Sequence, residues 1–535
     1  MQSALSTHID KGYLMIMLHA HLPYIRYPEH ENFLEENWLY ESMTETYIPL
    51  INIFEDLLDD GVDFRISLSL SPPLIEMFND DLLMNRYQRY LHKLIELSEK
   101  EIRRNRKDIR FRDLAKMYHR RFLKIRHLFE NVYRRDLIAA FRGLMESGRV
   151  EIAASSATHA YLPALMSEPT SVKAQLQLAV AHFKKIFATR PSGIWLPECG
   201  FSSEMDSMLK GAGLGYFFLE SHGVLNSIPK SRKNMYTSVK TPSGITVFAR
   251  DSSSSRQVWS AQEGYPGDPA YRDFYRDIGF DLDYDYIKPY LPGGIRTFTG
   301  IKYFRITNSS SDRKRPYNRE KALQKAEFHA VNFIKSRERQ IRSLKKRLKI
   351  SPLITAAFDA ELFGHWWFEG PEWLNHLLRK GSGKGTAFRL ITPSEFIAEN
   401  PVTEILNPSL SSWGMNGYSA TWIDPSNSWV YKHMHRAAKR MEELSRKNIK
   451  ARGLAKRALN QAARELLLAQ ASDWAFMMQK EKASAFAKKK FSEHITNFST
   501  LYQEITSGRI SRKHLAFLEH KDNIFADIDF KIYAG

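Results

Sequence analysis

The stretch GIWLPECGF, residues 193–201, places the carboxylate of Glu198 directly after a short apolar run. An apolar run of this length, ended by a turn, predicts a buried strand. A carboxylate there costs free energy unless it is paired or functional, and strand ends are where barrel enzymes place their reacting groups. Glu198 is therefore the first candidate site residue.

Six further apolar runs have a similar length and are separated by helical patterns or long connections. They cover residues 13–18, 64–70, 150–155, 216–220, 246–250 and 353–358. Near-continuous apolar strands spaced by helices predict parallel strands that are covered on both faces. Seven such strands favour a barrel-like α/β domain. An open, doubly wound sheet is the alternative, and the missing glycine-rich phosphate motif disfavours it.

The remaining chain predicts two helical regions. Residues 74–147 are polar and helix-patterned, and they are too long for a single crossover between strands. After about residue 405, apolar residues recur at three- and four-residue spacing, at 433–447, 451–480 and 484–507. We therefore predict an α/β domain made of residues 1–73 and 148–404, a helical insertion of 74–147 and a C-terminal helical domain of 405–535.

Composition excludes several classes of protein. The 535 residues are 43% hydrophobic and contain one cysteine, Cys199, so internal disulfides and multi-cysteine zinc sites are ruled out. The sequence contains no apolar stretch of 18 residues, so it predicts no membrane-spanning helix. The net charge of +18 lies in helical patterns with interspersed acids, which indicates solvated helix faces more than nucleic-acid binding. We expect a cytoplasmic protein that binds neither membrane nor nucleic acid and forms a monomer or small homo-oligomer.

Histidines follow two of the predicted strands. In HAHLPY, residues 19–24, alternation along a strand puts His19 and His21 on one face. Such a pair can bind a metal, hydrogen-bond a polyhydroxyl substrate or be satisfied within the core. His159 follows the 150–155 run and can join the same surface, whereas Glu151, inside that run, can be a buried structural acid.

A second carboxylate, Asp359, follows the apolar run in LITAAFDAELFGHWW, residues 353–367. Glu198 and Asp359 are thus predicted at the same ends of two strands. Retaining glycoside cleavage needs this arrangement: an ionised carboxylate attacks the anomeric carbon, and a protonated one about 5–5.5 Å away gives a proton to the leaving oxygen. Chance placement of acids in loops is the alternative.

Tryptophans and one further acid complete the candidates. Trp413 and Trp422 lie in a segment rich in glycine, serine and proline, where an indole can stack on a sugar or pack at a domain junction. Asp473, in QASDWAFMM, lies inside the predicted helix 451–480. It is either a structural contact or a site residue that reaches in from the C-terminal domain.

Five segments, in order, resemble glycoside hydrolase family 57: HAHLPY, GRVEIAAS, WLPECGF, FDAELFGHWW and ASDW. Within that family the chain looks most similar to 1,4-α-glucan branching enzymes and related α-amylase-like members. The resemblance implies an incomplete (β/α)7 barrel with an inserted helical domain and a C-terminal helical domain. It also implies a retaining mechanism that requires no metal or other cofactor.

The resemblance also implies a role for each candidate residue. Glu198 matches the nucleophile and Asp359 the general acid/base. The residues that match substrate-binding positions are His19, His21, His159, Asp473, the acceptor-side Trp413 and Trp422, and the cleft-lining Phe280. Branching members use a tyrosine on a loop. In this sequence the matching residue is Tyr236, Tyr265 or neither.

These observations predict a branching enzyme that cleaves α-1,4-glucan and transfers the chain to a 6-hydroxyl. An α-amylase or 4-α-glucanotransferase of the same family is the alternative. From other classes we weigh a metal-dependent hydrolase or deacetylase with His19, His21, His159 and Asp359 as ligands, and a basic glycan- or nucleic-acid-binding protein without catalysis.

Overall fold

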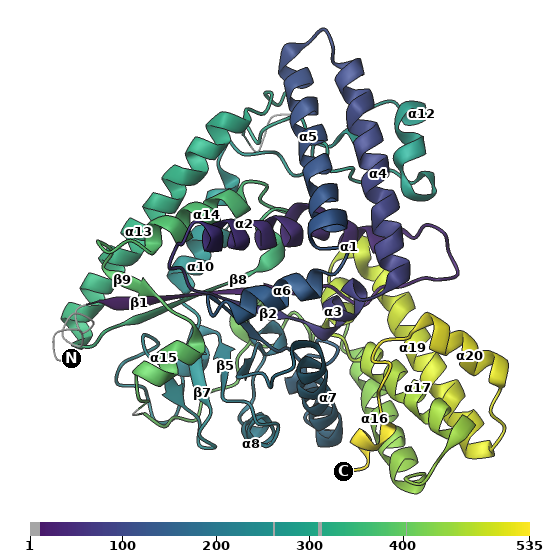
Figure 1. The fold of residues 1–535 in the computed structure, drawn as a ribbon. Helices are drawn as coiled ribbons and strands as arrows, with labels where there is room; N and C mark the ends of the chain where they lie inside the picture. The colour runs from purple at the N-terminus through teal and green to yellow at the C-terminus, as the bar shows by residue number, and fades with distance from the viewer. Residues whose placement is uncertain (1–10, 261–262, 309–312, 403) are drawn as a thin grey trace.

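Two sheets form the centre of the computed structural model, which describes residues 11–260, 263–308, 313–402 and 404–535 (Figure 1). One sheet has the order β3-β2-β1-β8, with β9 paired to β1, and the other has the order β4-β5-β7-β6. The strands are β1 (Gly12–Ala20), β2 (Ile66–Leu70), β3 (Val150–Ala153), β4 (Gly193–Ile194), β5 (Tyr216–Leu219), β6 (Val239–Lys240), β7 (Thr246–Ala249), β8 (Leu353–Asp359) and β9 (Phe388–Leu390). All pairs are parallel except β6 with β7.

Isolated parallel bridges join the two sheets at both edges. Ala154 pairs with Ile194, and Arg250 pairs with Thr355. Each of the seven predicted runs contains a strand, so the predicted α/β class is confirmed. The runs are nearly continuous in apolar residues because β1, β2, β5 and β7 are buried along their whole length. The sequence missed β6 and β9, which are too short to show a periodicity.

Further helices lie between and after the strands along the chain. They are α1 (Asn37–Ser42), α2 (Ile48–Asp59), α7 (Pro169–Phe187), α8 (Asp206–Gly211), α9 (Ser221–Leu225), α10 (Ser252–Trp259), α11 (Ile278–Asp281), α12 (Tyr284–Ile287), α13 (Arg319–Leu348), α14 (Gly370–Gly381) and α15 (Pro393–Glu399). The described chain contains no helix that is both long and apolar enough to cross a membrane.

The predicted insertion contains α3 (Pro72–Phe78), α4 (Asp81–Arg104), α5 (Ile109–His127) and α6 (Leu137–Glu146). The long pair α4 and α5 projects away from the sheets, whereas α3 and α6 lie close to them (Figure 1). Asp80 caps α4 by accepting a hydrogen bond from the Leu83 amide at 2.9 Å. The boundaries of the insertion at 74 and 147 stay a prediction.

The C-terminal region is helical, as predicted. It consists of α16 (Trp429–Lys447), α17 (Gly453–Ala469), α18 (Ser472–Met478), α19 (Glu481–Ser507) and α20 (Arg512–Lys521). The prediction of one continuous helix over 451–480 is wrong, because the helix is interrupted between α17 and α18. Ala471 forms an antiparallel bridge with Ala160, and the Ser472 amide donates to the His159 carbonyl at 3.0 Å. Asp473 therefore lies in the first turn of a separate short helix.

Candidate active site

Glu198 and Asp359 both lie at the carboxyl ends of parallel strands. Glu198 follows β4 within the helical turn Pro197–Cys199, and Asp359 is the last residue of β8, in register with His19 of β1. The backbone of Glu198 is left-handed, with φ 63° and ψ 18°, and Cys199 follows with φ 50°. Two adjacent non-glycine residues in this region cost on the order of 1–3 kcal/mol each, and such strain gathers where a side chain must point in a set direction.

Both carboxylate oxygens of Glu198 accept hydrogen bonds from distant parts of the chain. Trp413 Nε1 donates to Oε2 at 2.8 Å, and Ser472 Oγ donates to Oε1 at 2.7 Å. The Trp413 amide also donates to the Glu198 carbonyl at 2.8 Å. Hydrogen bonds to a charged acceptor contribute about 1.5–3 kcal/mol each, so these donors favour an ionised and oriented Glu198.

The surroundings act differently on the ionisation of the two acids. Burial, followed by the negative charge of Glu198, raises the pKa of Asp359 from 3.8 to about 7. Burial also raises the pKa of Glu198, but the hydrogen bonds from Trp413 and Ser472 oppose that rise. Burial and the neighbouring charge thus favour the protonated form of Asp359, whereas the two hydrogen bonds favour the ionised form of Glu198.

Two serines, in β2 and directly after it, contact the two histidines in and directly after β1. His19 Nδ1 lies 2.6 Å from Ser69 Oγ, and His21 Nδ1 lies 2.8 Å from Ser71 Oγ. The register pairs His19 with Ser69, so the same two-residue period that puts the histidines on one face puts the serines beside them. The two rings are fixed by neighbouring strands before any substrate binds.

The structure brings all three predicted histidines and Asp473 together. His19 Nε2 lies 2.8 Å from His159 Nε2, and His21 Nε2 lies 3.0 Å from the Asp473 carboxylate. His159 Nδ1 is 3.8 Å from Glu198 Oε1, which joins the cluster to the acid pair. Burial lowers the pKa of His21, but the charge and hydrogen bond of Asp473 outweigh it and raise that pKa overall. His21 is therefore the imidazole suited to carry a charge.

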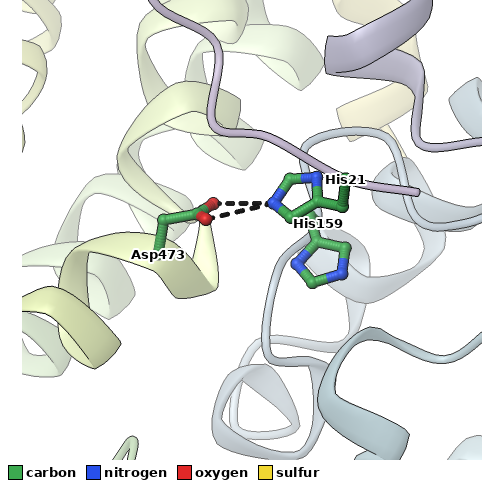
Figure 2. A group of neighbouring side chains, drawn as sticks. All are labelled: His21, His159 and Asp473. Atoms are coloured by element: carbon green, nitrogen blue, oxygen red, sulfur yellow. Dashed lines mark hydrogen bonds and ion pairs between the residues drawn. The ribbon is translucent and has the colours of Figure 1, made fainter. Parts of the chain in front are cut away.

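Figure 2 shows the part of this cluster that could hold a metal, His21, His159 and Asp473, whose candidate ligand atoms lie within 4.8 Å of one another. The two rings are stacked, with centroids 3.6 Å apart and planes 13° apart. A ligating imidazole directs its lone pair in the plane of the ring, so one ion cannot lie in both planes at about 2 Å from each nitrogen. The arrangement does not fit a metal unless a ring turns.

The predicted tryptophans have different environments. Trp413 is half-buried and contacts Glu198 as described, with the Arg250 guanidinium 5.2 Å from its ring centre. The expectation that Trp422 offers an acceptor-side ring face is wrong in this structure. Trp422 is 1% exposed and stacks on Tyr161 with ring centres 5.0 Å apart. Its ring packs against Tyr161 and does not face solvent.

Phe280 and the two loop tyrosines lie outside the contacts of the acid pair. Phe280, on α11, is 46% exposed and packs on Phe298. The Tyr236 carbonyl accepts from the Leu353 amide, at the amino end of β8 and so opposite to Asp359. Tyr265 is buried against His329, with ring centres 4.4 Å apart. Neither tyrosine reaches the site in this structure.

Several residues that contact the candidate site were missed from the sequence. Ser472 donates to Glu198, and Glu361 Oε1 accepts from the His21 amide at 3.1 Å and from the Tyr47 hydroxyl. Arg250 donates to Glu220 at 2.9 Å beside the acid pair. Only Ser69 and Ser71, in SLSLS, had a readable signal, a two-residue period that matches His19 and His21. The other contacts join residues too distant in the chain for a local pattern.

The pKa of Asp359 makes a stability prediction. Because its folded pKa, about 7, exceeds its ordinary value of 3.8, the favourable contribution of this acid is complete below pH 4 and is lost as pH rises through 7. Asp359→Asn cannot ionise. Its melting temperature should therefore rise relative to the unaltered protein between pH 4 and pH 8, as measured by thermal denaturation across that range. A difference independent of pH would contradict the raised pKa.

Comparisons with known proteins agree over nearly the whole chain. The family model of glycosyl hydrolase family 57 matches residues 15–409, and the model of the 1,4-alpha-glucan branching enzyme C-terminal region matches residues 433–533. A 1,4-alpha-glucan branching enzyme of Thermococcus kodakarensis is 33% identical, over 97% of this chain and 78% of that protein.

Two solved structures are similar to nearly all of the molecule. The alpha-amylase AmyC of Thermotoga maritima is 42% identical with a TM-score of 0.92, covering 98% of this chain and 99% of that one. A branching enzyme of Pyrococcus horikoshii is 32% identical with a TM-score of 0.88, covering 98% and 97%.

Proposed function

The chain belongs to glycoside hydrolase family 57, and from this premise we propose that it is a retaining 1,4-α-glucan branching enzyme. The observation that carries the proposal is the pair formed by Glu198 and Asp359. They lie at the carboxyl ends of parallel strands, with burial and mutual charge raising the pKa of Asp359 to about 7. Hydrogen bonds from Trp413 and Ser472 orient Glu198 for attack.

In the first step, Glu198 attacks the anomeric carbon while Asp359 gives its proton to the departing glycosidic oxygen. The product is a glucosyl ester on Glu198, and Asp359 is left as a carboxylate. In the second step, the 6-hydroxyl of an acceptor glucan loses its proton to Asp359 and attacks the same carbon. Two inversions give net retention, and water in place of the acceptor gives hydrolysis.

The polar cluster beside the pair suits a polyhydroxyl ring. His21 and Asp473 form a partly buried, hydrogen-bonded pair with side chains 9% and 14% exposed, and they can exchange hydrogen bonds with sugar hydroxyls. Trp366, 47% exposed, meets Trp259, 40% exposed, with ring centres 5.3 Å apart. These two indoles follow the carboxyl ends of β8 and β7, where they can stack on glucose units.

The two sheets support an incomplete (β/α)7 barrel. The parallel order β1-β2-β3 continues through the Ala154–Ile194 bridge to β4, β5 and β7, and the Arg250–Thr355 bridge leads on to β8 and back to β1. Residues 1–73 and 148–404 would form this barrel, with 74–147 inserted and 405–535 packed at its mouth. Asp473 and Ser472 enter the site from this last region.

An α-amylase is the second candidate, because AmyC of Thermotoga maritima has the higher identity of the two structures. The match of residues 433–533 to the branching-enzyme C-terminal model favours branching. Transfer also requires that a 6-hydroxyl outcompete water, which depends on a bound acceptor chain and excluded solvent. Neither Tyr236 nor Tyr265 lies where it could help, so product analysis must decide.

Incubation with amylose should lower iodine staining with few new reducing ends, and the products should carry α-1,6 links. Reducing ends should then appear when a debranching enzyme is added, since each transfer hides one chain end in a branch. Proton NMR of the anomeric region measures the new links directly. Reducing ends released in proportion to the loss of stain, without α-1,6 signals, would identify an amylase instead.

A further inference from the structure

Four side chains form an unbroken line of hydrogen bonds that ends on the predicted nucleophile. Ser69 Oγ lies 2.6 Å from His19 Nδ1, and His19 Nε2 lies 2.8 Å from His159 Nε2. On the other side of its ring, His159 Nδ1 lies 2.9 Å from Ser472 Oγ, which lies 2.7 Å from Glu198 Oε1. Each of the four ring nitrogens of His19 and His159 takes part in one hydrogen bond of this line.

The direction of the line follows from the charge of Glu198. A carboxylate only accepts hydrogen bonds, so the single hydroxyl proton of Ser472 must point to Oε1. Ser472 Oγ then accepts from the Nδ1–H of His159, which leaves Nε2 of that ring as an acceptor. His19 must therefore donate from Nε2, and its Nδ1 accepts from Ser69. One ionised carboxylate thus fixes both tautomers.

The surroundings keep both histidines neutral, as this direction requires. Burial lowers the pKa of His19 and of His159, and the neighbouring imidazoles lower them further. His19 also stacks on Trp195 with ring centres 5.0 Å apart, so the ring cannot turn without losing that packing. His21 is not a member, because its Nε2 faces Asp473 and its Nδ1 faces Ser71.

We propose that Ser69, His19, His159 and Ser472 form a directional hydrogen-bond chain that keeps Glu198 ionised and oriented, with Ser472 as a positioning residue. This inference rests on the proposed function, because it assigns Glu198 the role of nucleophile. A chain of neutral donors stabilises the carboxylate without adding the full positive charge that would weaken it as a nucleophile.

The hydrogen-bond chain also explains why residues of the C-terminal region enter the site. Ser472 begins α18, and its amide donates to the His159 carbonyl at 3.0 Å. His159 has a left-handed backbone with φ 56°, which turns its ring between His19 and Ser472. A break between α17 and α18 is needed for this contact. The titratable groups that interact with Glu198 are His21, His159, Asp359, Asp473, Tyr161, Tyr431 and Cys199.

Replacing Ser472 by alanine tests the hydrogen-bond chain. The acid limb of kcat/KM against pH reports the ionisation of the nucleophile in the free enzyme. Ser472→Ala should move this limb up by about one pH unit and lower kcat/KM by about tenfold or more at neutral pH. Ser472→Thr keeps the hydroxyl and should restore the limb. Ser69→Ala, at the far end of the chain, should shift the limb in the same direction by less.

Ser67→Ala is the matched control, because Ser67 lies on the same strand, is fully buried and has no hydrogen-bond partner. It should leave the acid limb in place. The chain is overturned if the unaltered enzyme turns over amylose and Ser472→Ala keeps its acid limb, or if Ser67→Ala shifts the limb as much as Ser69→Ala does. Absence of turnover in the unaltered enzyme would instead overturn the proposed function.

Discussion

Glu198→Gln is expected to lower amylose turnover by roughly four to six orders of magnitude, the range seen when a covalent nucleophile is removed. The amide keeps the shape of the side chain and can still accept from Trp413 or Ser472 through its oxygen. It cannot form the glucosyl ester, so both transfer and hydrolysis should be lost together. Iodine staining and reducing-end release, measured on the same samples, check the result.

Glu151→Gln is a matched control for this substitution. Glu151 is also a strand acid, but it accepts from the Tyr216 hydroxyl at 2.7 Å and from Ser394 Oγ at 2.6 Å, away from the acid pair. This variant should lose stability and keep its turnover per folded molecule. Glu198→Gln with normal turnover would remove the mechanism, whatever the control does.

Asp359→Asn is expected to have the second large effect, a loss of roughly three to four orders of magnitude on amylose. The leaving oxygen of a glucan needs a proton, and an asparagine has none to give. A substrate with an acidic phenol as leaving group needs little protonation, so its first step should be far less affected. The rate on the phenol-leaving substrate is divided by the rate on amylose. The change in this ratio between the variant and the unaltered enzyme measures the contribution of the proton.

Azide separates the two roles. With an aryl glucoside substrate, Asp359→Ala should be accelerated by azide and give the α-glucosyl azide, because azide then attacks the ester on Glu198. Glu198→Ala should give the β-glucosyl azide, because azide attacks from the vacated side. The same anomer from both variants would show that the roles are assigned wrongly.

A local pattern was enough for the central strands and the two acids. The seven apolar runs stand out because their strands are buried on both faces, so nearly every residue in them must be apolar. Glu198 and Asp359 are visible against that background as the first charges after a run. The two-residue period of a strand likewise places His19 and His21 on one face.

Local pattern failed where distant contacts override it. The 451–480 periodicity predicts one helix, but the Ala160–Ala471 bridge breaks it just before Asp473. Trp422 has polar neighbours in the sequence and is nonetheless buried on Tyr161.

The sequence by itself determined the strands, the helical regions and the two acids, since each depends on residues that are neighbours in the chain. Only the tertiary structure decided how those acids are tuned. Trp413 and Ser472 reach Glu198 across 215 and 274 positions of sequence. The pKa of Asp359 depends on burial and on the charge of Glu198, which follows a different strand. Electrostatic and hydrogen-bond energies depend on distance in space, which no local spacing of residues records.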